Sequence, residues 1–145
     1  MTAFRFRLEQ VLAWRRSQLE AAEARFRQEA AAVAELDRSR VELEAAGART
    51  EFEVRQWNPV AGSELEALSR FRAHVRQQEA QLASRRAQAV ERLEEQRRSL
   101  LDARRRCRLI ERLRERRLAE WQAAADREIE QMAAESHLAG LARRR

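Results

Sequence analysis

Apolar residues recur at intervals of three and four along nearly the whole chain, which is the spacing of a helical stripe. With heptad position a placed at Leu12, that position holds Leu12, Leu19, Phe26, Val33, Arg40, Gly47 and Val54. Position d then holds Leu8, Arg15, Ala22, Glu29, Leu36, Leu43, Thr50 and Trp57. Val11, Val41 and Phe52 lie beside this series, which indicates a stripe that drifts as an imperfect heptad repeat does. The pattern predicts one long helix over residues 7–57.

One short segment interrupts the helical pattern. Residues 58–63, Asn-Pro-Val-Ala-Gly-Ser, contain the single proline and one of the three glycines. Because proline and glycine mark turns, this segment predicts a reversal of the chain. Ser63 is a favourable N-cap for a second helix, and Glu64 and Glu66 would lie in its first turn, where the helix dipole favours negative charge.

A second apolar stripe follows the turn and predicts a helix over residues 64–139, with a frayed tail over 140–145. Its members are Leu65, Leu68, Phe71, Val75, Leu82, Ala89, Leu93, Leu100, Cys107, Ile110, Leu118, Trp121, Ala125, Ile129 and Met132. The second helix is longer than the first, so its C-terminal end should extend unpaired. The fold class predicted is all-α: an antiparallel two-helix coiled-coil hairpin with the second helix longer, forming a single coiled-coil domain over 1–145.

The composition agrees with a coiled coil better than with a globular core. Charged residues make up 37% of the 145 residues, aromatic residues only 6%, and there is no tyrosine. Alanine supplies a large part of the 44% hydrophobic content. Since a two-helix seam buries little apolar surface per residue, we expect modest stability alone and stabilisation by a partner.

Charge and cysteine usage narrow the partners and the compartment. All 30 basic residues are arginine, and the formal net charge is +6, which favours acidic partners: an acidic protein face, anionic lipid or nucleic acid. The single Cys107 predicts a reducing compartment. Neither a membrane-spanning stretch nor the apolar core of a secretory signal is present in the sequence, which predicts a cytoplasmic protein with peripheral membrane attachment left open.

The sequence offers no chemistry typical of an enzyme. His74 and His137 lie far apart with no ligand cluster near either, so we expect no metal and no cofactor. Phosphate-binding loops and nucleophile motifs are absent, so we expect neither catalysis nor a small-molecule substrate. Scattered Glu and Arg residues are explained by pairing four residues apart along each helix.

Three groups of residues remain as candidates for binding. Trp14, Trp57 and Trp121 are each assigned to packing by default; Trp57 is expected to pack across the turn, and Trp121 to lie where a seam partner is missing and to anchor an interface. Residues 97–117 hold ten arginines against three acids. They form either a solvated exterior or an electrostatic collar that steers docking onto an acidic rim: Arg104, Arg105, Arg106 and Arg108.

The N-terminal segment carries the most specific signal. Residues 4–12, Phe-Arg-Phe-Arg-Leu-Glu-Gln-Val-Leu, are followed by Arg15 and Arg16. This opening, the layout of two unequal helices and the entry of the second helix from Gly62 to Val75 resemble the flagellar export protein FliJ family. Composition alone favours a terminal segment that folds back on the helices, whereas the resemblance favours a docking tip.

The resemblance implies a stalk similar to the stalk subunit of rotary ATPases. Family members are soluble parts of the bacterial flagellar type III protein export apparatus. They bind the hexameric export ATPase, contact the membrane export gate and handle export chaperones. By position, the ATPase-facing residues would be Phe4, Phe6, Leu8, Val11, Leu12, Trp121, Ile129 and Met132. The gate-facing residues would be Phe52, Phe71 and Val75. The family often has tyrosines near the tip, whereas this chain has no tyrosine.

Three alternatives stay open. An injectisome stalk would have the same shape and a different ATPase. A generic coiled-coil scaffold or homodimer would differ in mass in solution, because the stalk hypothesis predicts a monomer in isolation. A rod that binds nucleic acid is disfavoured because the arginine-rich stretch lacks interleaved aromatic residues, and we expect no nucleic acid partner.

Overall fold

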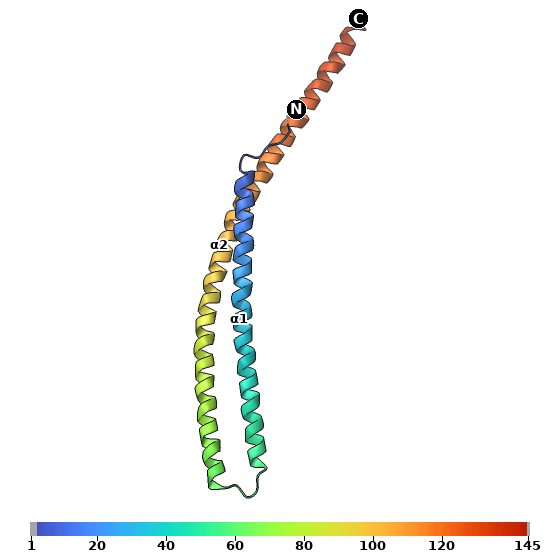
Figure 1. The fold of residues 1–145 in the computed structure, drawn as a ribbon. Helices are drawn as coiled ribbons and strands as arrows, with labels where there is room; N and C mark the ends of the chain where they lie inside the picture. Colours follow the sequence, from blue (N-terminus) through green and yellow to red (C-terminus); the bar gives the residue numbers. More distant parts are fainter. Residues whose placement is uncertain (1–2, 145) are drawn as a thin grey trace. The chain divides into compact units, whose positions relative to one another are not determined.

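The computed structural model describes residues 3–144 and contains two α-helices. Helix α1 covers Glu9–Arg55 and helix α2 covers Gly62–Ala142. The described residues form no strand, and the two helices pack against each other. The all-α prediction is therefore confirmed. Figure 1 shows α1 leading through the short connection into α2.

The connection between the helices covers residues 56–61 and not the predicted 58–63, because α1 ends at Arg55 and α2 begins at Gly62. The assignment of Ser63 as N-cap was wrong, because α2 already begins at Gly62. The carbonyl of Ala61 accepts hydrogen bonds from the backbone N–H groups of Glu64 (3.0 Å) and Leu65 (3.2 Å). The Glu64 carboxylate reaches back to the N–H of Ala61 at 2.8 Å. This glutamate performs one half of a capping box, which lets the helix start without a hydroxyl cap.

The C-terminal end of α2 also differs from the prediction. The predicted tail over 140–145 is helical as far as Ala142, so Gly140 does not end the helix; Arg145 lies outside the described residues. A glycine inside a helix costs only about 1 kcal/mol relative to alanine. The neighbouring Ala139 and Leu141 are good helix formers and carry α2 through this position.

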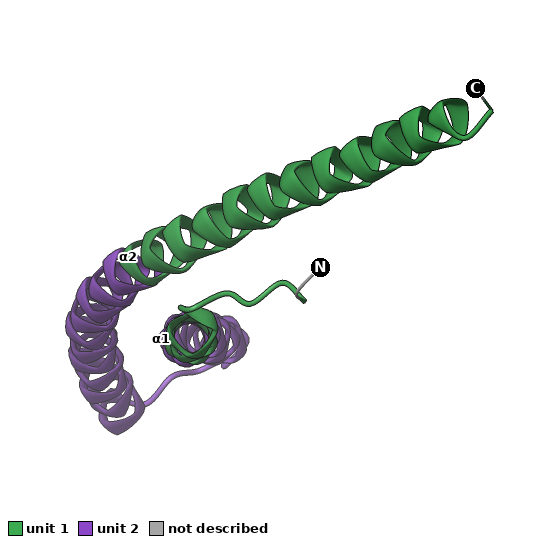
Figure 2. Cartoon of the chain, turned by 90° about the horizontal axis from the view of Figure 1, so that it is seen from above, with its two compact units in different colours: residues 1–20, 101–145 green, residues 21–100 purple. Residues whose placement is uncertain are grey.

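The chain divides into two compact units, coloured separately in Figure 2. Unit 1 contains residues 1–20 and 101–145, and unit 2 contains residues 21–100. In unit 2 the two helices are joined by three ion pairs: Glu29–Arg92, Asp37–Arg86 and Glu51–Arg72. In unit 1 they are joined by Glu9–Arg114 (3.1 Å) and Arg16–Glu111 (3.3 Å). Within each unit, partners later in α1 lie earlier in α2.

The buried residues fall on the two predicted stripes. They are Leu12, Ala22, Leu68, Ala89, Leu100, Cys107 and Ala125. The a and d positions predicted for α1 are buried or half-buried except Arg40 and Trp57. In contrast, Val11, Val41 and Phe52 are exposed. The interpretation that the stripe drifts toward these residues was therefore wrong. The contact surface of α1 keeps the same a and d positions along the helix.

Gly47 lies where α1 packs on α2, as its a position suggested. A methyl group built at this glycine would meet Cγ1 of Val75 at 3.8 Å, an ordinary van der Waals distance. We expect Gly47→Ala to stabilise unit 2 by about 0.5–1 kcal/mol, because alanine is a better helix former and the methyl group fits. Urea unfolding followed by circular dichroism measures this change.

Gly140→Ala is the matched control, since nothing lies within 4 Å of a methyl group at that position. It should produce the propensity gain without new packing, and a smaller gain because the end of a helix frays more readily. Destabilisation by Gly47→Ala would show that α1 and α2 approach more closely at this point than the contact with Val75 indicates.

Candidate protein-binding surfaces

The N-terminal segment folds back on α2 within unit 1. Residues 3–8 precede α1, and together with part of α2 they line a groove of about 1180 Å³. The ring of Phe4 lies 6.0 Å from that of Trp121, with the planes tilted by 55°. The guanidinium of Arg114 lies 6.0 Å from the Phe4 ring centre. The expectation that Trp121 lacks a partner was therefore wrong, because the start of the same chain supplies one.

The other candidates near the N-terminus have unequal positions. Phe6 and Leu8 are half-buried and line the same groove. Val11 is exposed on the outside of α1. Leu12 is only 1% exposed and is the largest fully buried side chain among the described residues. The assignment of Leu12 to docking was therefore wrong. Its side chain packs between the helices and presents no surface to a partner.

The C-terminal end of α2 carries apolar side chains in solvent. Ala125 is the last buried residue of α2, and residues 126–144 are all exposed. Ile129 and Met132, predicted to face a partner, are 53% and 60% exposed. Met132 occupies the same heptad position as Leu118 and Ala125, so the stripe that packs on α1 continues past its last covered residue.

Unit 2 brings together two of the three residues assigned to the gate. Phe71 and Val75 are half-buried and line a groove of about 320 Å³ with Gly47, and the remaining lining comes from charged residues of both helices and Ala48. Phe52 lies outside this groove and is 65% exposed. Sequence reasoning missed the polar rim of the groove, and the signal that could have revealed it is Arg72 and Arg76 at helical spacing beside Phe71 and Val75.

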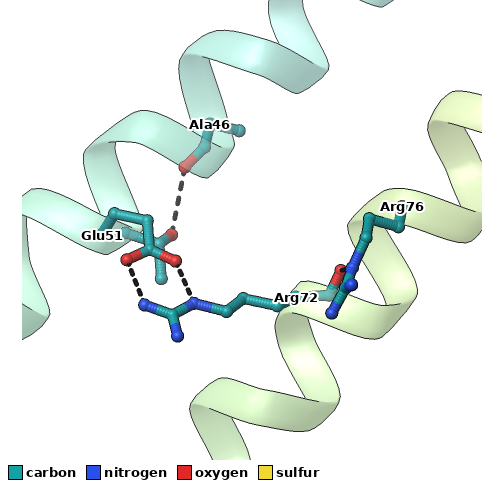
Figure 3. Close-up of polar contacts among 5 residues, drawn as sticks. Ala46, Glu51, Arg72 and Arg76 are labelled. Atoms are coloured by element: carbon teal, nitrogen blue, oxygen red, sulfur yellow. Dashed lines mark hydrogen bonds and ion pairs between the residues drawn. The ribbon is translucent and has the colours of Figure 1, made fainter.

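An ion pair between Glu51 and Arg72 is part of the lining of this groove. Figure 3 shows the Arg72 guanidinium directed at the Glu51 carboxylate, with Arg76 one turn further along α2. Both oxygens of Glu51 accept hydrogen bonds from Arg72, through Nε and through Nη2 at 2.6 Å. The Nε of Arg76 donates to the carbonyl of Arg72 at 3.4 Å. Such bidentate pairs between helices fix their register more than a single contact does. The scattered charges were expected to pair within one helix. Only some of them do so, because others, such as Glu51 and Arg72, pair between the helices.

The pKa shifts of the two acids in unit 2 give a pH dependence. The hydrogen bond from Arg86 lowers the pKa of Asp37, and that from Arg72 lowers the pKa of Glu51. An acid whose pKa is lower in the folded state than in the unfolded state stabilises the fold at pH above its unfolded-state pKa. This stabilisation is lost as the pH falls through the folded-state pKa. We expect the midpoint of urea unfolding to fall as pH drops below the ordinary values of 3.8 and 4.5.

The effect should be small because all four side chains reach solvent. A double variant, Asp37→Asn with Glu51→Gln, is the control: its unfolding midpoint should depend less on pH over the same range. An equal slope in the variant and in the unmodified chain would show that other acids cause the acid sensitivity.

The four arginines of the predicted collar do not act as a set. Arg106 pairs with Asp102 at 2.9 Å along the same helix. Arg105 and Arg108 make no ion pair or hydrogen bond with another described residue, whereas Arg104 does interact. The collar is therefore partly neutralised. Sequence reasoning missed a different grouping: Arg105, Arg108, Arg112 and Arg116 follow one another by three or four residues and share one exposed face.

The remaining singled-out residues divide between packing and exposure. Cys107 is buried, as predicted from its position in the stripe, and burial raises the pKa of its thiol, with Glu111 adding to the effect. Trp14 is exposed, and the guanidinium of Arg15 lies 4.6 Å from its ring centre. Trp57 is 46% exposed, and its packing across the turn stays a prediction.

Two other features are absent from the described residues: a cluster of metal ligands and a membrane-spanning helix. Residues 3–144 contain no group of three or more histidine, cysteine and acidic side chains placed to hold a metal ion. Neither helix has, over its described residues, an apolar stretch of the length and character needed to cross a membrane.

Comparison with known proteins gives no assignment. The chain matches no protein-family model, no curated protein and no solved structure.

Proposed function

We propose that the chain is a non-enzymatic stalk of the FliJ type, built as an antiparallel coiled-coil hairpin that acts by binding other proteins. The reversed order of the ion pairs between α1 and α2 supports the antiparallel arrangement. The heptad spacing of the buried side chains supports the coiled coil.

The observation that carries a protein-binding role is the apolar stripe beyond Ala125. In a monomeric soluble protein, apolar side chains that continue a packed face into solvent mark a site for another protein. Ile129 and Met132 continue the face formed by Leu118 and Ala125. Both side chains are exposed to solvent among the described residues. A helix presenting anchors three residues apart is suited to insertion into an apolar groove or pore.

The likeness of residues 4–12 to the FliJ family makes the partner specific. In this proposal unit 1 enters the ring of the hexameric flagellar export ATPase and stimulates hydrolysis. The groove of Phe71 and Val75 in unit 2 would contact the cytoplasmic domain of the membrane export gate, and export chaperones would be further partners. The protein would lie in the cytoplasm, held peripherally at the inner face of the membrane at the flagellar base.

The experiment that tests the proposal measures ATP hydrolysis by the purified export ATPase of the same organism, with and without this protein. We expect several-fold stimulation at stoichiometric amounts, since a stalk in the pore stabilises the active ring. A variant that lacks Leu12 is unsuitable because its burial would confuse docking with folding. Ile129→Ser with Met132→Ser removes the exposed stripe instead and should abolish the stimulation.

Leu109→Ser with Leu138→Ser is the matched control. These leucines are 65% and 64% exposed on α2 but lie off the stripe that faces α1, so stimulation should persist. If the folded protein gives no stimulation, or if both double variants behave alike, the docking role of the stripe is wrong. Binding to the gate domain without stimulation would favour an adaptor.

A further inference from the structure

A second face of α2, directed away from α1, has a symmetrical order of charges. Its residues follow one another by three or four positions: Leu101, Arg105, Arg108, Arg112, Arg116, Ala119, Ala123, Asp126, Glu130, Ala134, His137 and Leu141. Every one of them is exposed. The mean step of this series is close to the roughly 3.6 residues per turn of an α-helix, so the residues stay on one side of a straight helix. Figure 2 shows α2 of unit 1 as a straight rod.

This face is distinct from the surface that packs on α1. The covered residues of α2 in unit 1 include Ala103, Cys107, Trp121 and Ala125. Each of them is two residues from a member of the exposed series, which places it about 200° around the helix. Met132 is likewise two residues from Glu130, so a partner on the exposed face would leave the packing of α1 and the side chain of Met132 untouched.

The spacings between successive residues of this face, three or four positions each, occur in the same order when the series is followed from either end. Two copies of α2 laid antiparallel would therefore place Arg116 opposite Asp126, Arg112 opposite Glu130 and Leu101 opposite Leu141. The two-fold axis would pass between Ala119 and Ala123, whose small side chains let helices approach closely. Every charge pair would occur twice, once on each side of the axis.

The charges on this face lack partners among residues 3–144, which the structure describes. Arg112, Arg116, Asp126 and Glu130 make no ion pair or side-chain hydrogen bond with another described residue. Like charges stand four residues apart in both groups, an arrangement that disfavours the helix until opposite charges cover it. An antiparallel second copy supplies arginines to the acids and acids to the arginines.

We propose that this face binds a second copy of the same chain, forming a two-fold antiparallel dimer through α2. An acidic protein or an anionic surface fits less well, because Asp126 and Glu130 would repel it. The charges also fix the register, since a shift by one heptad would put Arg112 opposite Ala123 and Arg116 opposite Ala119. The interface is narrow and polar, so the dimer should be weak and the dilute protein monomeric, as the stalk hypothesis predicts.

Charge reversal with sedimentation velocity tests the proposal on the full chain. The unmodified protein should shift from monomer to dimer as its concentration rises. Variant A, Arg112→Glu with Arg116→Glu, and variant B, Asp126→Arg with Glu130→Arg, should each remain monomeric because like charges then face each other. A mixture of A and B should form a heterodimer, and the fourfold exchange in one chain should dimerise again.

Recovery in the mixture separates pairing from damage to the fold, since neither variant alone could regain a lost structure by mixing. Circular dichroism of A and B should match that of the unmodified chain. The proposal is overturned if the unmodified chain stays monomeric at all concentrations, or if A and B fail to associate. It is also overturned if vesicles of anionic phospholipid bind the unmodified chain and the fourfold exchange equally while neither dimerises. Stimulation of the ATPase is a separate readout and does not depend on these results.

Discussion

Leu12→Ala should destabilise unit 1 by about 2–4 kcal/mol, the largest effect of any single substitution considered for this chain. Leu12 is 1% exposed, and the ion pairs on either side of it join α1 to Arg114 and Glu111 of α2. Removal of its side chain leaves a cavity between two helices that have few other buried large residues. The loss is measured by urea unfolding followed by circular dichroism.

Val11→Ala provides the control for the Leu12 variant. Val11 is the preceding residue on the same helix but lies outside the packed surface, so its truncation should change the unfolding free energy by no more than about 0.5 kcal/mol. Equal effects of the two substitutions would show that α1 does not pack on α2 with the face that contains Leu12.

Trp121→Ala should release the N-terminal segment and cost unit 1 about 1–2 kcal/mol, because it removes the ring against which Phe4 packs. Residues 3–8 have no helix of their own, so their position depends on this contact and on the groove around it. The Arg5 and Arg7 side chains are already exposed, but a backbone held in the groove cannot enter the active site of trypsin. Release of the segment therefore makes the bonds after both arginines cleavable. Mass spectrometry of brief digests should show faster cleavage after these two arginines in the variant.

Two further substitutions separate this effect from general loss of stability. Trp121→Phe keeps an aromatic ring and should preserve most of the protection. Trp14→Ala removes an exposed tryptophan of unit 1 and should leave cleavage after Arg5 and Arg7 unchanged. Unaltered cleavage in Trp121→Ala would mean that the segment is held by contacts other than the ring pair.

The burial of Leu12 also affects how the proposed stalk would work. Leu12 and Leu8 were expected to act together at a docking tip, but they serve different purposes: one packs the helices and the other borders the groove of the N-terminal segment. The apolar residues that remain available to a partner lie further along, on α2 at Ile129 and Met132. Docking at the ATPase would therefore rest on the second helix more than on the first dozen residues.

The two helices follow from the sequence alone, because the residue preferences that form each helix act locally along the chain. Alanine, leucine, glutamate and arginine favour helix at nearly every position, and the segment around Pro59 provides the one interruption. The sequence also determined most of the contact surface, because a regular heptad leaves only one continuous apolar face for each helix. Leu12, Ala22, Leu100 and Cys107 all belong to that face in the heptad pattern of the sequence, and all are buried in the structure.

Tertiary structure decided everything that depends on which residues meet across the helices. The stripe alone could not reveal that Phe4 covers Trp121, since the two lie in distant parts of the sequence and no periodicity links them. The pairing of Glu51 with Arg72 likewise depends on register, which the sequence leaves open. The same holds for the exposed arginines of α2: their shared face can be counted from the sequence, but only the position of α1 shows that this face is uncovered.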